Sequence, residues 1–181
     1  MTVRRKHIRE MVETLLKKYG VRSAPVPVEK IAQSSGIQIK LDEVDDDLSG
    51  FLFRDARSKT VLIGANKSHH PNRRRFTIAH ELGHFMLHKG EVVHLDKGRG
   101  AFMLNKRDAK SATGEDDNER EANLFAAELL MPAKFLERDL RGQSFDILEE
   151  DVFFLSKLAG QYEVSVQALT IRLSYLGYIK T

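Results

Sequence analysis

The first part of the chain carries hydrophobic residues at the three- and four-residue spacing of amphipathic helices. This spacing predicts one helix over residues 4–19, which Gly20 ends. Its apolar face is formed by Ile8, Met11, Val12, Leu15 and Leu16. A second, shorter helix is predicted over residues 28–35, because Pro27 suits a first turn and Gly36 suits the position after a last turn.

Three short runs of strand-forming residues follow, at 37–41, 49–53 and 60–64. Between them lie an acidic run at 45–47 and a polar stretch at 54–59, which have the composition of turns. We therefore expect a small, antiparallel sheet of three strands.

The next predicted helix, over residues 73–88, is apolar around nearly its whole circumference. Asn72 is suited to cap its start and Gly90 to follow its end. Its apolar residues are Phe76, Ile78, Ala79, Leu82, Phe85, Met86 and Leu87. A helix that is apolar all round is buried, so polar residues inside it need a function or a partner. Periodicity is then lost over residues 94–117, which predicts a long loop.

The rest of the sequence is helical in pattern. Four further helices are predicted, over residues 118–130, 133–141, 149–159 and 165–176. The last is bounded by Ser165 as its N-cap and Gly177 after its end. We divide the chain into a main α+β domain of residues 1–142 and a helix-turn-helix-like tail of residues 143–181.

Composition restricts the chemistry that this chain can perform. It has no Cys among 181 residues, which excludes disulfides, thiolate zinc fingers, Fe–S clusters and a cysteine nucleophile. Any metal must therefore be held by carboxylates and by some of the 7 His. The sequence shows no apolar run that could span a bilayer and no signal-peptide pattern at its start, so we expect a cytoplasmic protein without membrane contact.

The segment His80-Glu81-Leu82-Gly83-His84 matches the HExxH pattern and falls inside the buried helix. Residues four apart on a helix lie about 40° apart around the axis and about 6 Å along it. Both imidazoles can therefore reach one Zn²⁺ at about 2.0–2.1 Å. Glu81 is rotated by about 100° from His80, so it can act on water as a general base without binding the metal.

A catalytic zinc needs a third protein ligand, and later residues offer candidates. His88 lies a further ~6 Å along the helix, so we interpret it as a histidine at the helix C-terminus. Glu119 shares its helical face with small residues that permit close packing, whereas Glu121 lies on a different stripe. We favour Glu119 and keep Glu121 as the alternative; Asn123, one turn after Glu119, is suited to accept a hydrogen bond from a ligand His.

Two segments, RFTIAHELGH at 75–84 and EREANLFAAELLMP at 119–132, resemble the ImmA/IrrE family of metallopeptidases. The resemblance extends over nearly the whole chain. It implies a zincin-like fold of the gluzincin type, with a small sheet, an active-site helix, a Glu-bearing helix and a helical tail. It also implies that His80, His84 and Glu119 bind zinc and that Glu81 is the catalytic base.

The same resemblance implies a class of substrate. Members are typically cytoplasmic, and several are encoded on mobile elements beside a helix-turn-helix repressor that they inactivate by site-specific cleavage; others accompany toxin–antitoxin modules. We therefore expect a zinc-dependent endopeptidase that cuts such a repressor or an antitoxin-like partner. The alternative is a non-proteolytic, zinc-containing module that acts by binding a regulator or DNA. Glu81 favours the enzyme, since a structural zinc needs no base.

Three further hypotheses concern how a substrate is bound. An extended peptide is expected to pair with an edge strand, for which 60–64 is the candidate, unless that strand is internal. The basic loop at 95–117 is a candidate lid or docking surface. The proton donor is left open between His69, His70, His94 and a tyrosine.

The charge of the predicted tail argues against direct DNA binding. Residues 143–181 contain three Lys or Arg and five Asp or Glu, a balance of −2. Binding to duplex DNA needs a cationic face that displaces counterions. The chain as a whole has 29 Lys+Arg and 26 Asp+Glu, and its +3 charge favours a protein partner over DNA because the basic residues lie in the N-terminus and the loop.

Overall fold

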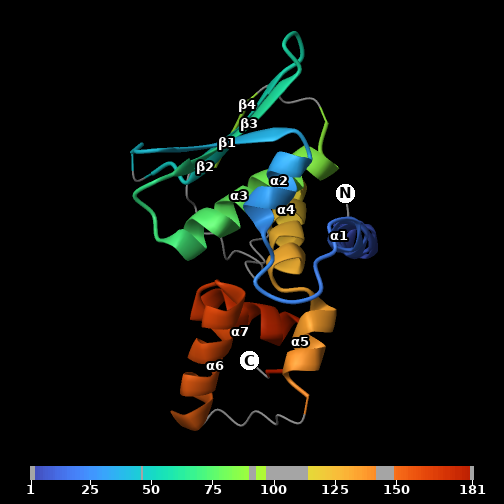
Figure 1. Cartoon of the computed structure of the whole chain (residues 1–181), viewed down its shortest axis with the longest axis vertical. Helices are drawn as coiled ribbons and strands as arrows, with labels where there is room; N and C mark the ends of the chain where they lie inside the picture. The colour runs from blue at the N-terminus through green and yellow to red at the C-terminus, as the bar shows by residue number, and fades with distance from the viewer. Residues whose placement is uncertain (1–2, 46, 90–92, 97–113, 142–148, 180–181) are drawn as a thin grey trace.

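The computed structural model describes residues 3–45, 47–89, 93–96, 114–141 and 149–179 (Figure 1). The first elements are α1 (Arg5–Lys18), α2 (Val28–Ser34), β1 (Ile37–Asp42), β2 (Gly50–Asp55), β3 (Thr60–Asn66) and α3 (Pro71–Leu87). They are followed by β4 (Val93–Asp96), α4 (Gly114–Leu130), α5 (Ala133–Asp139), α6 (Glu149–Tyr162) and α7 (Val166–Tyr175). The predicted mixed α+β class is confirmed, and the predicted helices are all present within a few residues of their expected ends.

The sheet has four strands in the order β1-β3-β2-β4, so the prediction of three antiparallel strands was wrong. β1 pairs with β3 in parallel, and β2 pairs with β3 and with β4 in antiparallel register. β1, β2 and β3 run in alternating directions, so β1 and β3 point the same way. They form a parallel pair because β3 lies between β1 and β2 in the sheet, although β2 precedes β3 in the sequence. Most residues of β4 fall within the loop that the sequence predicts. Four residues are too few for the alternation of apolar and polar side chains to be distinguished from irregular chain.

The position of β3 also corrects the prediction about the substrate strand. Residues 60–64 lie between two hydrogen-bonded neighbours, so they form an internal strand, and the described sheet has β1 and β4 as its edges. Strand alternation shows which face a side chain points to, but it carries no information about which strand lies next to it.

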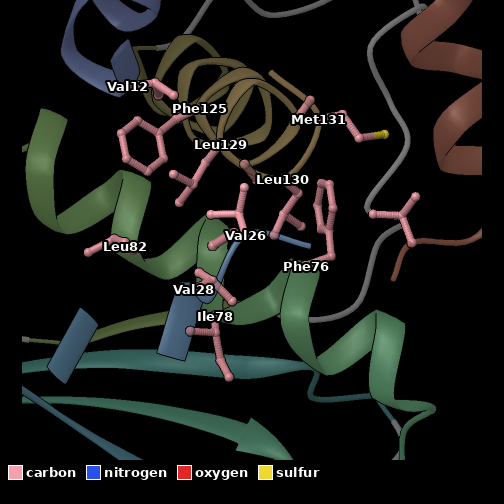
Figure 2. Packing of buried hydrophobic residues seen from close by; sticks show 14 of the residues in the cluster. Val12, Val26, Val28, Phe76, Ile78, Leu82, Phe125, Leu129, Leu130 and Met131 are labelled. Atoms are coloured by element: carbon pink, nitrogen blue, oxygen red, sulfur yellow. The ribbon is translucent and has the colours of Figure 1, made fainter. Parts of the chain in front are cut away.

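One face of the sheet is covered by α3, and α4 packs on the far side of α3 (Figure 1). The sheet contributes Ile37, Leu52 and Ile63 to a core that continues between the two helices. Figure 2 shows Ile78 of α3 directed toward the sheet, while Phe125 and Leu129 lie on α4. This order of layers explains why α3 is apolar on nearly every side.

The start of α3 differs in detail from its prediction. Pro71 occupies the first turn, and His70 is the N-cap, with its Nδ1 accepting a hydrogen bond from the backbone N–H of Asn72 at 3.2 Å. Proline suits a first helical turn because its missing N–H has no partner there in any case. The helix ends at Leu87 with His88 as C-cap, and the expected terminator Gly90 lies outside the described residues.

Residues of the predicted tail pack against the rest of the chain. Arg172 of α7 is buried and forms an ion pair of 2.6 Å with Glu128 of α4, and Asn72 donates a hydrogen bond to the carbonyl of Val164. The proposed boundary between domains at 142/143 falls in residues 142–148, outside the described part, and stays a prediction. None of the helices within the described ranges is long and apolar enough to cross a membrane.

Candidate metal centre

The close approach of α3 and α4 creates the candidate site. A Cβ added to Gly83 would lie 3.1 Å from both the Cα of Ala122 and the ring of Phe125. Because position 83 has no side chain, α4 can lie directly against the turn of α3 that carries the two histidines. The HExxH turn and the start of the glutamate helix are therefore brought face to face.

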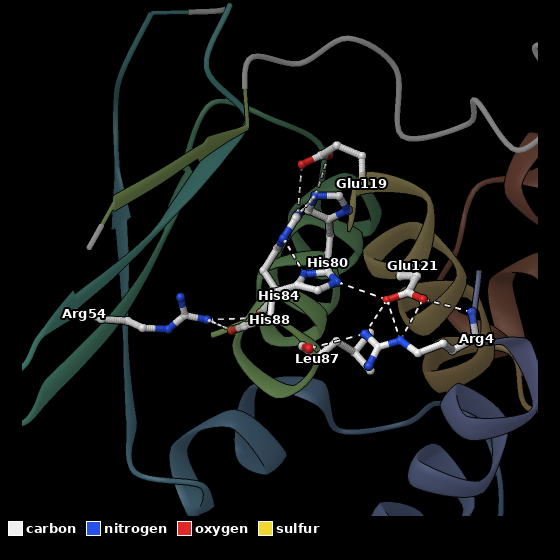
Figure 3. A network of polar contacts seen from close by, with 8 residues as sticks. All are labelled: Arg4, Arg54, His80, His84, Leu87, His88, Glu119 and Glu121. Atoms are coloured by element: carbon white, nitrogen blue, oxygen red, sulfur yellow. Dashed lines mark hydrogen bonds and ion pairs between the residues drawn. The ribbon is translucent and has the colours of Figure 1, made fainter. Parts of the chain in front are cut away.

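His80, His84 and Glu119 direct their polar atoms to one point (Figure 3). The two Nε2 atoms are 3.0 Å apart, and the Glu119 oxygens lie 3.4 Å from His80 Nε2 and 3.2 Å from His84 Nε2. Ligands about 2.0–2.1 Å from a tetrahedral zinc are about 3.3–3.4 Å from one another. Both the chemistry of this donor set and its spacing therefore fit zinc.

Asn123 lies on α4, one turn after Glu119. Its Oδ1 is 3.0 Å from His80 Nδ1. When the amide oxygen accepts from Nδ1–H, the Nε2 of His80 carries a lone pair that faces Glu119 and His84. The contact thus selects the form of His80 that can bind a metal.

Glu121, the alternative ligand, faces another direction. Its carboxylate accepts hydrogen bonds from the backbone and guanidinium of Arg4, and it lies 3.2 Å from His88 Nε2. His88 in turn places Nδ1 at 3.1 Å from Nδ1 of His84. The sequence located His88 correctly at the helix end but missed this contact, although its four-residue spacing from His84 was the available signal.

Glu81 and His94 complete the group. The Glu81 side chain is fully buried, and its Oε2 lies 3.2 Å from His94 Nδ1. The other ring nitrogen of His94 is 2.8 Å from Glu119 Oε1. His94 pairs with Leu52 in the sheet, and since that partner is a buried core residue, both side chains point to the helix-covered face.

The position of His94 separates it from the other two histidines considered as proton donors. His69 and His70 precede α3, and ten residues from His70 to His80 correspond to about 15 Å along the helix. His94 is the one of the three histidines that reaches the described site. Sequence reasoning could name it only as one of several because it comes from the strand that was assigned to a loop. The five loop cations, Lys97, Arg99, Lys106, Arg107 and Lys110, lie outside the described residues.

The surroundings set the protonation states of these groups. Burial lowers the pKa of His84 to about 4, so its imidazole is neutral. Burial alone would raise the pKa of Glu119, but its contacts with His80, His84 and His94 outweigh burial and hold that pKa far below its ordinary value. Burial likewise opposes the charge of His94, while hydrogen bonds to Glu119 and Glu81 raise its pKa to about 10. A neutral imidazole and an ionised carboxylate are the forms that bind a cation.

A mixed α+β fold that holds two histidines of an HExxH helix against a glutamate of a second helix has the site of a metallopeptidase-type protein. The family model of the IrrE N-terminal-like domain, Peptidase_M78, matches residues 32–174. The chain therefore belongs to this family, the ImmA/IrrE metallopeptidases, as its two motifs predicted.

Two similar proteins come from bacilli and their phages. The chain is 31% identical over 125 residues to "Uncharacterized immunity region protein 2" of Bacillus phage phi105. The match covers 69% of this chain and 68% of that protein. It is 30% identical over 139 residues to "Metallopeptidase ImmA" of Bacillus subtilis (strain 168), spanning 75% of this chain and 69% of that protein.

A solved structure shares the fold at low sequence identity. A "Mycobacterium tuberculosis transcriptional regulator" matches 93% of this chain with a TM-score of 0.60 and 16% identity. The chain spans 46% of the length of that structure, so the likeness concerns one part of a larger protein and the fold alone.

Proposed function

We propose that this chain is a zinc-dependent endopeptidase that makes a site-specific cut in a helix-turn-helix transcriptional repressor or an antitoxin-like protein. The observation that carries the proposal is the convergence of His80, His84 and Glu119 on one point, with the buried Glu81 beside it. In this proposal the sheet, α3 and α4 form a zincin-like domain of the gluzincin type, and the protein acts in the cytoplasm. The relatives named for an immunity region and for a metallopeptidase support a regulatory protein substrate.

The proposed ligands are His80, His84 and Glu119, with Asn123 orienting His80. A bound zinc would acidify a water molecule and polarise the carbonyl of the scissile peptide. Glu81 would take the proton of the attacking water on its carboxylate and pass it to the leaving amine. The Glu81 side chain is buried, which keeps bulk water away from its carboxylate. The proton would therefore pass from the attacking water to Glu81 and on to the leaving amine.

His94 is proposed as the donor that stabilises negative charge on the carbonyl oxygen. Its ring nitrogens lie within hydrogen-bonding distance of both Glu81 and Glu119, so the imidazole stands where water and substrate would meet. To donate to that oxygen, His94 would exchange its contact with one of these carboxylates for the substrate, and its position in the site keeps the movement small.

The substrate is proposed to pair with β4. This strand is an edge of the described sheet and carries His94, while Val93 and Leu95 are about half exposed on its other face. An extended peptide that adds to an edge strand gains backbone hydrogen bonds, and exposed apolar side chains near it provide selectivity. β4 thus takes the role that the sequence had given to 60–64.

The test uses as candidate substrate the product of the neighbouring regulatory gene. Wild-type protein, Glu81→Gln and the control Glu10→Gln, which changes an exposed glutamate of α1, are each loaded with zinc and incubated with it. We expect one cut, mapped by mass spectrometry, with wild type and the control, and a rate at least about 100-fold lower with Glu81→Gln.

Cleavage at an unchanged rate by Glu81→Gln would contradict the mechanism. Absence of stoichiometric zinc from the purified wild type, measured by elemental analysis, would contradict the site. Zinc-dependent binding to the repressor without any cut in it would instead support the non-proteolytic module.

A further inference from the structure

A chain of contacts runs from the N-terminal segment to the candidate metal ligand His84 (Figure 3). Arg4 contacts the carboxylate of Glu121 through its backbone N–H at 2.8 Å and through its guanidinium at 2.5–3.2 Å. Glu121 Oε2 lies 3.2 Å from His88 Nε2, and His88 Nδ1 lies 3.1 Å from His84 Nδ1. The far nitrogen of His84 is the one that faces His80 and Glu119.

Hydrogen-bond chemistry assigns a direction to this chain. An ionised carboxylate only accepts, so the Nε2 of His88 must donate to Glu121. A neutral His88 then has a bare Nδ1 that accepts, and the proton in the next bond belongs to Nδ1 of His84. It follows that Nε2 of His84 carries the lone pair, which is the form that binds a metal.

We propose that Arg4 positions His84 for metal binding, acting through Glu121 and His88. Arg4 lies outside residues 32–174, the part that the family model matches, so the metal site of this chain is completed by a segment that precedes the family domain. The proposal rests on the proposed role of His84 as a ligand. Arg4 and Glu121 are positioning residues here, since neither reaches the point where the ligands converge.

Glu121 needs Arg4 in order to hold this orientation. The carboxylate is almost fully buried, with a side chain 6% exposed, and a buried carboxylate is stable only when it is paired. Arg4 supplies a two-pronged contact that fixes both the charge and the plane of the carboxylate. Its guanidinium also donates to the carbonyl of Leu87 at 3.4 Å, which ties the same arginine to the end of α3.

A separate arginine holds the backbone of this region and offers a control. Arg54 of β2 donates to the carbonyl oxygens of His84 and His88 at 2.8 and 3.0 Å. These two contacts fasten the end of α3 to the sheet through backbone oxygens. Loss of Arg54 therefore disturbs the helix end, whereas loss of Arg4 or Glu121 removes the constraint on the imidazoles.

The experiment compares Arg4→Gln and Glu121→Gln with Arg54→Gln and with Lys6→Gln, which changes an exposed cation two residues from Arg4. The zinc dissociation constant of each full-length protein is measured by competition with a chromophoric chelator. Protonation of the ring nitrogens of His84 is read from ¹⁵N NMR of the metal-free protein. The Arg4 side chain is half exposed, so we expect Arg4→Gln to fold even if Glu121→Gln does not. The proposal can then be tested with Arg4→Gln alone.

We expect Arg4→Gln and Glu121→Gln to weaken zinc binding by about 10-fold or more, the size of effect seen when groups that orient a ligand are lost. His84 should change from one form protonated at Nδ1 to a mixture of two forms in both variants, and in neither control. Unchanged zinc affinity would overturn the proposal. So would weakened affinity with an unchanged His84 spectrum, because the network would then be a stabilising contact alone.

Failure of the proposed function gives a different result. If His80 and His84 bind no zinc in the wild type, the proposed function fails. The NMR spectra of the metal-free proteins still show whether Arg4 and Glu121 select the form of His84.

Discussion

His94 contacts both Glu81, the proposed base, and Glu119, a proposed metal ligand. It comes from the edge strand β4, whereas Glu81 lies on α3 and Glu119 on α4. One imidazole therefore connects the sheet to both helices at the point where a substrate would bind. Its place beside the ligands, rather than among them, predicts that it acts on turnover and not on metal retention.

Replacing His94 by Gln tests that distinction. We expect the turnover rate on the repressor to fall by about 100-fold, since the proposed donor to the developing oxyanion is removed. The zinc dissociation constant should change by less than about threefold. His7→Gln, which alters an exposed histidine of α1, serves as the control. Loss of zinc from His94→Gln would show that His94 is a ligand and contradict this assignment.

Asn123 offers a test of how His80 is oriented. Asn123→Ala removes the acceptor of His80 Nδ1–H, and we expect zinc affinity to fall by about 10-fold. Asn123→Asp keeps an acceptor of the same length and should bind zinc at least as tightly as the wild type. Isothermal titration with zinc against a competing chelator measures both. Equal affinity in the Ala and Asp variants would mean that the 3.0 Å contact has no orienting role.

At the scale of elements, the site depends on how closely α3 and α4 pack. Gly83 lies against the backbone of Ala122 and the ring of Phe125. Gly83 and Ala122 are each within three residues of a proposed ligand on their own helix. A methyl group at this position has rigid backbone as its neighbour, so the two helices would have to separate. The distance between Glu119 and the histidines would then increase.

Gly83→Ala is expected to destabilise the protein by about 1 kcal/mol, because a packing cost of about 1–3 kcal/mol exceeds the gain of about 1 kcal/mol in helix propensity. Gly160→Ala is the matched control, since a Cβ there meets nothing within 4 Å. That variant should gain about 0.5–1 kcal/mol. Urea unfolding of both measures the difference, and stabilisation by both would show that the α3–α4 contact is not tight.

At the scale of the whole molecule, a buried ion pair fastens the C-terminal helices to the α4 layer. Arg172 and Glu128 have side chains 1% and 4% exposed, and Arg172 also donates to the carbonyl of Met131 at 3.1 Å. Arg9 of α1 reaches the same carboxylate at 3.6 Å. Glu128 therefore joins the first, fourth and seventh helices. Since Arg172 is occupied inside the protein, it adds nothing to a surface for DNA.

Breaking this pair on one side should cost more than removing both charges. Arg172→Met is expected to lose about 3 kcal/mol, because it leaves a buried carboxylate with one distant cation. Arg172→Met combined with Glu128→Met should recover most of that loss. Lys134→Met, which removes an exposed pair with Glu13, should change stability by less than about 1 kcal/mol. If the double variant is no more stable than Arg172→Met in urea unfolding, the loss in Arg172→Met does not come from leaving the Glu128 carboxylate buried without its partner.

Local sequence pattern was enough to locate the helices and the local part of the site. Periodicity located α1 and α3 and the part of α4 from residue 118 onward, and four-residue spacing on one helix placed His80 and His84 on the same side of it. These features depend on neighbours in the chain, so they can be read without knowing the fold. The small residues around Glu119 also indicated which face of α4 would pack against α3.

The strand order and the contacts that link distant segments depend on how the elements pack in three dimensions. Strand pairing is non-local, so neither the parallel β1–β3 pair nor the edge position of β4 follows from alternation. The same is true of Arg4, Glu121 and His94, whose polar groups carry no periodic signal. Arg4 meets Glu121, Glu121 meets His88 and His94 meets Glu81 because the N-terminal segment, α4 and β4 pack around α3. Local pattern fixes the spacing of residues along an element, while the packing of elements against a shared core fixes which side chains meet across it.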